Sequence, residues 1–218
     1  MPLQLEGLKT SAAEFAKQMS EVEIPSLFGV TDGKAVGTFI EHEFNSFIAK
    51  TYIHTAGNSA KGIDFPELNV DLKVTSVKQP QSSSPFRDAS QKIYGLGYHL
   101  LIMVYDKLDD HQNKTSKLQF LNVIFIDLKN TSDYQITRGL KHIISDQGTV
   151  EEIDGYLEDK NLPLDPSSRL ALAARILSDP PGLGGLTISN ALQWRLQYGR
   201  AITLSKDESI EGISDLIG

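Results

Sequence analysis

The sequence predicts a mixed α/β (α+β) fold in which a central mixed β-sheet is flanked by helices and followed by a helical C-terminal region. Residues 98–107 and 118–129 are dense enough in apolar residues to be strands buried on both faces, so they predict the centre of the sheet. Helical patterns precede them at residues 11–23 and 36–52, and further helical patterns follow in residues 132–179. This order of elements is typical of a mixed sheet with helical flanks.

The first third of the chain predicts two helices and a hairpin. Residues 11–23 have the composition of an opening helix, with Ser11 as its cap. Apolar residues recur at helical spacing in residues 36–52, which indicates an amphipathic helix. Residues 63–77 predict two short strands around a turn, with a proline and Asn69 as turn formers.

The middle of the chain predicts a loop and a further helix before the two buried strands. Residues 78–85 are polar and predict the loop. Residues 84–97 predict a helix with Ser84 at its cap and Pro85 at its first position.

The chain changes character after residue 130. Three helices are expected there, at residues 132–147, 149–160 and 165–179. Residues 186–205 fit either a helix from Ser189 onward or a pair of strands, and periodicity does not separate the two. We therefore expect a core in residues 1–130 and a mainly helical C-terminal region, residues 131–218, within the same compact domain.

The composition is that of an ordinary globular protein with one core, because 40% of the 218 residues are hydrophobic and 22% are charged. No apolar run approaches the roughly 20 residues of a membrane span, and the first residues lack the pattern of a signal peptide. We therefore expect a cytoplasmic protein that has no membrane partner. Cysteine is absent, which excludes thiolate metal sites and cysteine nucleophiles.

The net charge of −7 is opposite to that of a purely electrostatic DNA binder. The charges are unevenly spread, however, and the segment between residues 73 and 92 has four basic residues against Asp88. A negative total with one basic side is compatible with a DNA cleft that faces away from the acidic surfaces.

Residues 62–73, GIDFPELNVDLK, gather two aspartates and a lysine around a short turn. If residues 70–74 form a strand, Asp71 and Lys73 point to the same face, and the turn brings Asp64 alongside. Two converging carboxylates form the hard oxygen site that Mg²⁺ prefers, and a lysine can offset charge on a phosphate. The segment therefore has the residue types that metal-dependent phosphodiester hydrolysis needs.

A solvated hairpin is the alternative interpretation, since exposed strands often carry aspartate and lysine. A second Asp-Leu-Lys segment, with Asp127 and Lys129, shows how little the three-residue pattern specifies. Phe120 stands there at the position that corresponds to Asp64, and we interpret this second copy as the polar end of a buried strand.

Residues 35–78 resemble the active-site region of the PD-(D/E)xK nucleases, most closely the MutH mismatch-repair nickase and related type II restriction enzymes. The pattern in that family is an aspartate, six residues, an acid, one residue and a lysine, which Asp64, Asp71 and Lys73 match. Asn69 replaces the usual glycine, and Asp71 replaces the usual glutamate. An upstream Gly-x-x-x-Glu helix of the family corresponds to Gly37 and Glu41.

The resemblance implies a restriction endonuclease-like core and a Mg²⁺-dependent endonuclease that acts on double-stranded DNA. Asp64 and Asp71 would bind the metal, Lys73 would assist the attacking water, and Glu41 would complete or tune the site. We prefer a type II restriction enzyme over a nickase because the chain beyond the motif departs from the nickase. A palindromic target would require a symmetric homodimer, whereas a nickase acts as a monomer, and the sequence does not decide between them.

The expected DNA contacts lie outside the motif. Lys92 and Arg87 fall in the region that matches a basic helix of the family, and Arg195 lies in the segment QWRLQYGR, whose residue types read bases or grip phosphates. The alternatives are a solvated lysine at position 92 and a C-terminal element that buries its aromatic residues in the core.

A non-catalytic binding domain with the same fold is the second hypothesis, and it would explain the negative net charge. The intact set of Glu41, Asp64, Asp71 and Lys73 favours the enzyme. The glycine-containing turns have neither the P-loop lysine nor the full dinucleotide fingerprint, so we expect no nucleotide cofactor.

Overall fold

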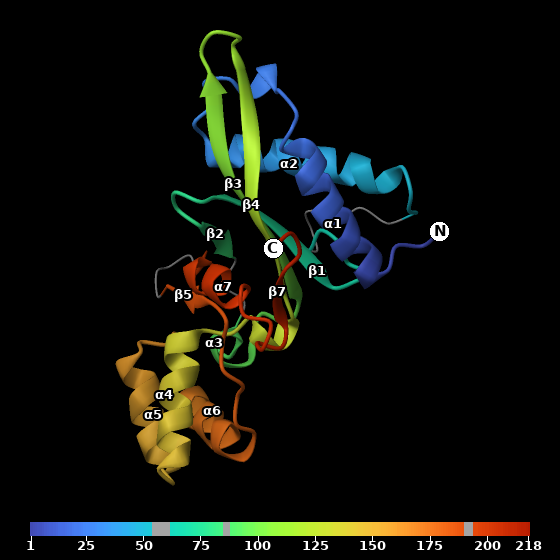
Figure 1. The fold of residues 1–218 in the computed structure, drawn as a ribbon. Helices are drawn as coiled ribbons and strands as arrows, with labels where there is room; N and C mark the ends of the chain where they lie inside the picture. Colours follow the sequence, from blue (N-terminus) through green and yellow to red (C-terminus); the bar gives the residue numbers. More distant parts are fainter. Residues whose placement is uncertain (54–61, 85–87, 190–193) are drawn as a thin grey trace.

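The computed structural model describes residues 1–53, 62–84, 88–189 and 194–218. A four-stranded sheet lies at its centre, in the order β1-β3-β4-β7 (Figure 1). Its members are β1 (Val70–Ser76), β3 (His99–Asp110), β4 (Thr115–Ile126) and β7 (Ile213–Asp215). β1 is parallel to β3, and the other neighbours are antiparallel. The predicted mixed sheet with helical flanks is confirmed.

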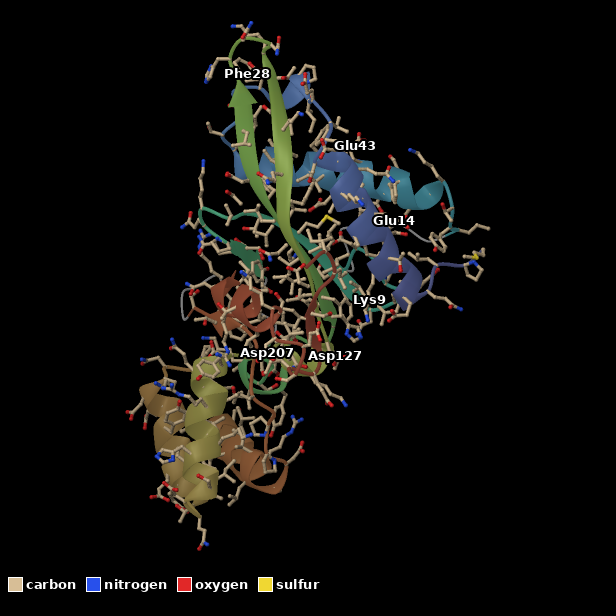
Figure 2. The ribbon with its side chains drawn as sticks, in the orientation of Figure 1. Lys9, Glu14, Phe28, Glu43, Asp127 and Asp207 are labelled. Atoms are coloured by element: carbon tan, nitrogen blue, oxygen red, sulfur yellow. The ribbon has the colours of Figure 1, made fainter. Side chains whose placement is uncertain are left out.

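The two apolar segments form the long central strands as expected, and both strands continue into the hydrophilic segment between them. Only residues 111–114 form the turn of this hairpin. The hairpin extends past the rest of the sheet, and Phe28 lies beside its tip (Figures 1 and 2). The Phe28 ring packs edge-on against His111, with 5.4 Å between the ring centroids.

Helices α1 (Leu5–Met19) and α2 (Gly33–Ala49) pack on one face of the sheet, together with the short 3₁₀ turn η1 (Pro25–Leu27). The prediction for α2 is confirmed, but α1 begins six residues earlier than expected. Ser11 is buried inside α1 and does not cap it. The apolar stripe of α1 already starts at Leu8, which is buried in the core, and this extends the helix toward the N-terminus.

A second, three-stranded sheet packs on the other face, in the order β2-β6-β5. It consists of β2 (Gln81–Ser84), β5 (Thr187–Ile188) and β6 (Trp194–Gln197), and α7 (Gly199–Leu204) follows it. The predicted loop is therefore confirmed at residues 78–80 but wrong at residues 81–84, and the predicted helix cap at Ser84 is wrong. These polar residues form a strand because β6 supplies the backbone hydrogen bonds. Of the two options for residues 186–205, the strand pair is correct for the first part.

The helix expected at residues 84–97 is reduced to the single turn α3 (Gln91–Tyr94), and Pro85 lies outside the described residues. Gly95 ends this turn with a φ of 93°. A Cβ atom at Gly95 would lie 2.6 Å from the Leu128 carbonyl oxygen, so the chain needs glycine where it turns toward β3.

The three predicted C-terminal helices are confirmed as α4 (Tyr134–Ser145), α5 (Val150–Asp159) and α6 (Pro166–Ser178). They have their own apolar cluster and form a lobe at the opposite end of the molecule from the hairpin tip (Figure 1). Side-chain caps start all three helices: Asp133, Thr149 and Asp165.

The chain returns from this lobe to the central body. β5 and β6 join the second sheet, and β7 pairs with β4 at the edge of the central sheet. Residues 187–215 therefore contribute strands to the body that residues 1–130 begin. Within the described ranges, none of the helices has the length and apolar composition that a membrane span needs.

Candidate active site

β1 presents Asp71 and Lys73 on the face of the central sheet that is opposite to α1 and α2. Val70 and Leu72 belong to the core beneath α1 and α2, whereas Asp71 pairs in register with Leu100, which belongs to the core beneath the second sheet. Alternation along the strand therefore puts both charged residues on one face, as the sequence predicts.

A tight turn brings Asp64 back to the edge of β1. The backbone groups of Phe65 and Val70 exchange two hydrogen bonds of 2.9 and 3.2 Å, and Asn69 closes the turn with a φ of 54°. An asparagine tolerates this left-handed conformation, which explains how it replaces the glycine of the resembling family. The first arm of the expected hairpin is only this single bridge and not a strand.

The Asp64 carboxylate binds directly to the backbone of β1. Its Oδ2 accepts a hydrogen bond of 2.8 Å from the backbone N–H of Leu72. Among the residues that the structure describes, β1 is an edge strand of the central sheet, so a side chain and not a neighbouring strand accepts this hydrogen bond. The bond fixes Asp64 beside Asp71, and hydrogen bonding between these two carboxyl groups contributes to the raised pKa of Asp71.

Asp71, which is buried, and Lys73, which is partly buried, form an ion pair with 2.8 Å between Nζ and Oδ2. The pKa of Asp71 is raised to about 7. Burial is the largest cause, Asp64 adds to the increase, and Lys73 only partly opposes it. Burial alone would lower the pKa of Lys73, but the Asp71 carboxylate outweighs it and the pKa is raised. The lysine is therefore a fixed cation at the site, and its side chain is 22% exposed.

Glu41 approaches the same carboxylates from α2. Burial raises its pKa, and Asp64 adds to this shift while Lys73 opposes it. Gly37 lies one turn earlier, where an added Cβ would be 3.9 Å from Val74 Cβ, so a side chain at this position would make an ordinary contact. Asp64, Asp71 and Lys73 thus come together, and Glu41 is near enough for the charges of Asp64 and Lys73 to affect its pKa. Glu43, labelled in Figure 2, is exposed as expected.

Two tyrosines near these carboxylates were not identified from the sequence as part of the site. Tyr198 is fully buried and its hydroxyl hydrogen-bonds Ser82 Oγ. Burial raises the pKa of Tyr198, and the negative charge of Asp71 contributes to the shift. Tyr98 is buried and acts on the pKa of Lys73. No local pattern marks them, because the second sheet brings Tyr198 to β1.

The donor set fits Mg²⁺. Asp64 and Asp71 offer carboxylate oxygens, and Mg²⁺ characteristically uses one or two protein carboxylates with water and substrate phosphates. A cation would also relieve the repulsion that contributes to the raised pKa of Asp71. The described residues contain no cluster of three or more acidic, histidine or cysteine side chains that could hold a metal. Water and phosphate oxygens would therefore complete the coordination that Asp64 and Asp71 begin.

The three expected DNA contacts have different positions. Arg87 lies outside the described residues, and Arg195 is exposed on β6. Lys92 is 1% exposed, with its ammonium 5.2 Å from the centre of the Trp194 ring. In this structure Lys92 therefore has no surface from which to reach a phosphate, and it is not a solvated lysine either. The Trp194 ring of β6 lies over the ammonium, and the Lys92 carbonyl is held by a hydrogen bond of 2.8 Å from Asp133 N.

Comparisons with known proteins agree with this chemistry. The family of the type II restriction enzyme NspV matches residues 2–215 of the chain. A curated relative, the type II restriction enzyme NspV from Nostoc sp., is 50% identical over 206 residues, which cover 94% of each chain. No solved structure matches. The match extends from α1 to β7 and includes the whole candidate active site, so the chain belongs to the NspV family of type II restriction enzymes.

Proposed function

We propose that this restriction endonuclease hydrolyses DNA with Mg²⁺ and that Asp64, Asp71, Lys73 and Glu41 form its catalytic centre. The observation that carries the proposal is the convergence of Asp64 and Asp71 at the edge of β1, with the Lys73 ammonium 2.8 Å from Asp71. This arrangement supports the resemblance to the PD-(D/E)xK nucleases, while closeness to MutH stays a prediction.

Asp64 and Asp71 would hold Mg²⁺ through their carboxylate oxygens. When bound, the ion supplies charge neutralisation at the scissile phosphate and acidifies a water molecule. Asp64 is held in place by the Leu72 N–H, and the buried position of Asp71 fixes the second oxygen donor. The protein thus positions the donors before substrate arrives, which lowers the reorganisation needed in the reaction.

Lys73 would donate hydrogen bonds to the phosphate oxygens or to the attacking water. Its raised pKa keeps the ammonium charged, so the side chain stabilises the negative charge that grows on phosphorus. Glu41 lies close enough to Asp64 and Lys73 for both of their charges to change its pKa. It would orient a water molecule or a water-mediated metal contact on the α2 side of the site.

The substrate would be double-stranded DNA with a specific sequence, as for type II restriction enzymes. A symmetric homodimer would cut both strands of a palindromic target, because the same interface then serves both subunits. A cytoplasmic location follows from this role, in which the enzyme cuts foreign DNA.

Incubation of the purified protein with supercoiled plasmid DNA tests this proposal. We expect discrete linear fragments with MgCl₂ and none with EDTA. Asp71→Ala should leave the plasmid intact, and Asp127→Ala, the matched variant in the second Asp-Leu-Lys segment, should cut as the wild type does. Fragments that persist with EDTA or in Asp71→Ala would contradict the proposed centre.

A further inference from the structure

We propose that the outward face of the β2–β6 ribbon reads base edges in the major groove of the DNA. Gln81, Ser83, Arg195 and Gln197 form this face, which we call the reading face. The inference rests on the proposed function, and it assigns sequence recognition to side chains that are separate from the catalytic centre.

The reading face follows from the alternation and register of the two strands. In β6, Trp194 and Leu196 are buried, whereas Arg195 and Gln197 are exposed. β2 pairs antiparallel with β6, so that Gln81 lies opposite Gln197 and Ser83 lies opposite Arg195. Paired residues on one face of an antiparallel ribbon are direct neighbours. Amide, hydroxyl and guanidinium groups therefore lie together on the side of the ribbon that faces away from the core.

The chemistry of this face matches base recognition. Arginine makes paired hydrogen bonds to guanine, glutamine makes them to adenine, and serine can contact several bases. A two-stranded β-ribbon fits the width of the major groove, and β5, the third strand of this sheet, widens the ribbon by only two strand residues, opposite Leu196 and Gln197. Alternate residues of a strand are about 6.6–6.8 Å apart, which is about twice the 3.4 Å step between bases on one DNA strand. One ribbon would therefore cover about two or three neighbouring base pairs.

A basic groove lies beside the reading face. Gln81, Ser83 and Arg195 line this groove, which has a volume of about 980 Å³. Its walls also carry the cationic side chains of Lys34, Lys78 and Lys107. Two of these cations have acidic partners: Lys107 is paired with Asp109, which lines the groove, and Lys78 lies 3.9 Å from Asp106, which does not line it. In a chain with a net charge of −7, this gathering of cations provides local contacts for DNA phosphates.

The ribbon is also fixed to the catalytic strand. Thr75, two residues after Lys73 on β1, accepts a hydrogen bond of 3.0 Å from Gln81 N through its hydroxyl. On the inner side, Ser82 bonds the Tyr198 hydroxyl, and Asp71 is near enough to raise the pKa of Tyr198. Bases held on the outer side would thus have a defined position relative to the scissile phosphate.

The test measures discrimination between DNA sequences. Sequencing the ends cut by the wild type from a pool of duplexes with a randomised segment identifies the target. Cleavage rates are then measured on duplexes that each carry one replaced base pair. We expect Arg195→Ala and Gln197→Ala each to reduce discrimination at least ten-fold at one position of the half-site and to leave the other positions unchanged.

Three further variants separate base reading from other roles. Arg195→Lys keeps the charge but loses the paired hydrogen bonds, so it should lose the same discrimination as Arg195→Ala. Lys34→Ala should slow cleavage of all duplexes by a similar factor and leave their ratios unchanged. Gln18→Ala, on the exposed surface of α1 across the sheet, should behave as the wild type.

The outcomes distinguish this inference from the proposed function. A wild type that cuts no duplex with MgCl₂ would overturn both. If the wild type cuts and the variants keep its discrimination, the inference about the reading face is wrong but the proposed function stands. The variants concerned are Arg195→Ala, Arg195→Lys and Gln197→Ala. Because Arg195 and Gln197 are exposed, unchanged melting temperatures should accompany the expected changes.

Discussion

The two Asp-Leu-Lys segments of the chain have the same residues but opposite surroundings. Asp71 and Lys73 lie inside β1 on one face of the sheet, where they form an ion pair. Asp127 and Lys129 follow the last residue of β4, where Asp127 caps the 3₁₀ turn η2 (Leu128–Asn130) by accepting a hydrogen bond from Lys129 N. The second copy is the polar end of a buried strand, as expected from the sequence.

The difference shows that the position in the sheet decides what this pattern can do. In β1 the strand alternation aligns the two side chains, and the turn at Asn69 adds Asp64. After β4 the chain leaves the sheet, so Lys129 is exposed and its side chain does not pair with Asp127 in the structure as described. At the position equivalent to Asp64 stands the buried Phe120. Matched substitutions in the two segments can therefore test the assignment.

The largest expected difference is between the effects of Lys73 and Lys129 on the cleavage rate. Lys73→Met removes the ammonium that we propose acts on the scissile phosphate, and loss of one such preorganised group lowers kcat by about 10²–10³-fold. Lys129→Met should cleave at the wild-type rate because its side chain is exposed, away from the site. Single-turnover cleavage of a cognate duplex with MgCl₂ measures both. Equal rates in the two variants would show that the position in β1 carries no catalytic advantage.

The next difference is in stability without metal. The folded-state pKa of Asp71 is about 7, above its usual 3.8, so its contribution to stability is fully present below about pH 4. That contribution is lost as the pH rises through 7, because Asp64 and the buried site then oppose the charge that Lys73 only partly offsets. Asp71→Asn should therefore stabilise the protein at pH 8 by roughly 1–4 kcal/mol, at about 1.4 kcal/mol for each unit of raised pKa.

Thermal unfolding in EDTA at pH 5 and pH 8 measures this gain. At pH 5 the carboxyl is protonated in the folded wild type but ionised in the unfolded chain, so Asp71→Asn should gain less than half as much stability as at pH 8. Asp127→Asn is the control, since asparagine also caps helical turns well, and it should gain nothing at pH 8. A wild type that is more stable than Asp71→Asn at pH 8 would contradict the assigned electrostatics.

Local patterns were sufficient to predict part of this molecule. Asp64, Asp71 and Lys73 could be placed because a strand and a tight turn determine their geometry over only ten residues. The helices after residue 130 were predicted for the same reason, since their caps and apolar spacing are local. The family resemblance then added Glu41, which approaches from α2.

Elements that depend on distant partners were missed. β2 is rich in serine, and it forms a strand because β6 pairs with it. β6 also carries Trp194, which lies beside the buried Lys92. Tyr198 follows directly after β6 and lies near enough to Asp71 for that charge to affect its pKa. Neither periodicity nor composition records such pairings, so the reading face became visible only with the register of the two strands.

A smaller effect is expected at the turn before the catalytic segment. Asn69 has a φ of 54° and donates a hydrogen bond of 2.9 Å from Nδ2 to the Gly97 carbonyl. Asn69→Ala should destabilise the protein by about 1–2 kcal/mol, because a Cβ without a polar partner disfavours this conformation. Asn69→Gly loses the side-chain bond but relieves the backbone, so we expect a change of about half that or less. Urea unfolding compares them, and equal losses would show that backbone conformation is not the cause.

The smallest expected effect is at the second segment, where Asp127 lies beside His99. Burial lowers the pKa of His99, Asp127 opposes this shift, and Lys9 adds to it. Nδ1 of His99 accepts a hydrogen bond of 3.0 Å from Leu128 N, which requires the unprotonated nitrogen. Because the folded-state pKa is lowered, the stability from this group is fully present above about pH 6.5 and is lost as the pH falls through the folded-state value.

Substitutions of the two neighbours should change this loss in opposite directions. Asp127→Asn removes the charge that favours protonated His99, so its melting temperature relative to the wild type should be lower at pH 5 than at pH 7. Lys9→Met removes the opposing charge, so its melting temperature relative to the wild type should be higher at pH 5 than at pH 7. Each change should stay below about 1 kcal/mol, since Asp127 is a partly exposed neighbour 3.5 Å from His99. If the melting temperatures of the wild type, Asp127→Asn and Lys9→Met change with pH in parallel, neither charge is coupled to His99. The second Asp-Leu-Lys segment would then differ even more from β1.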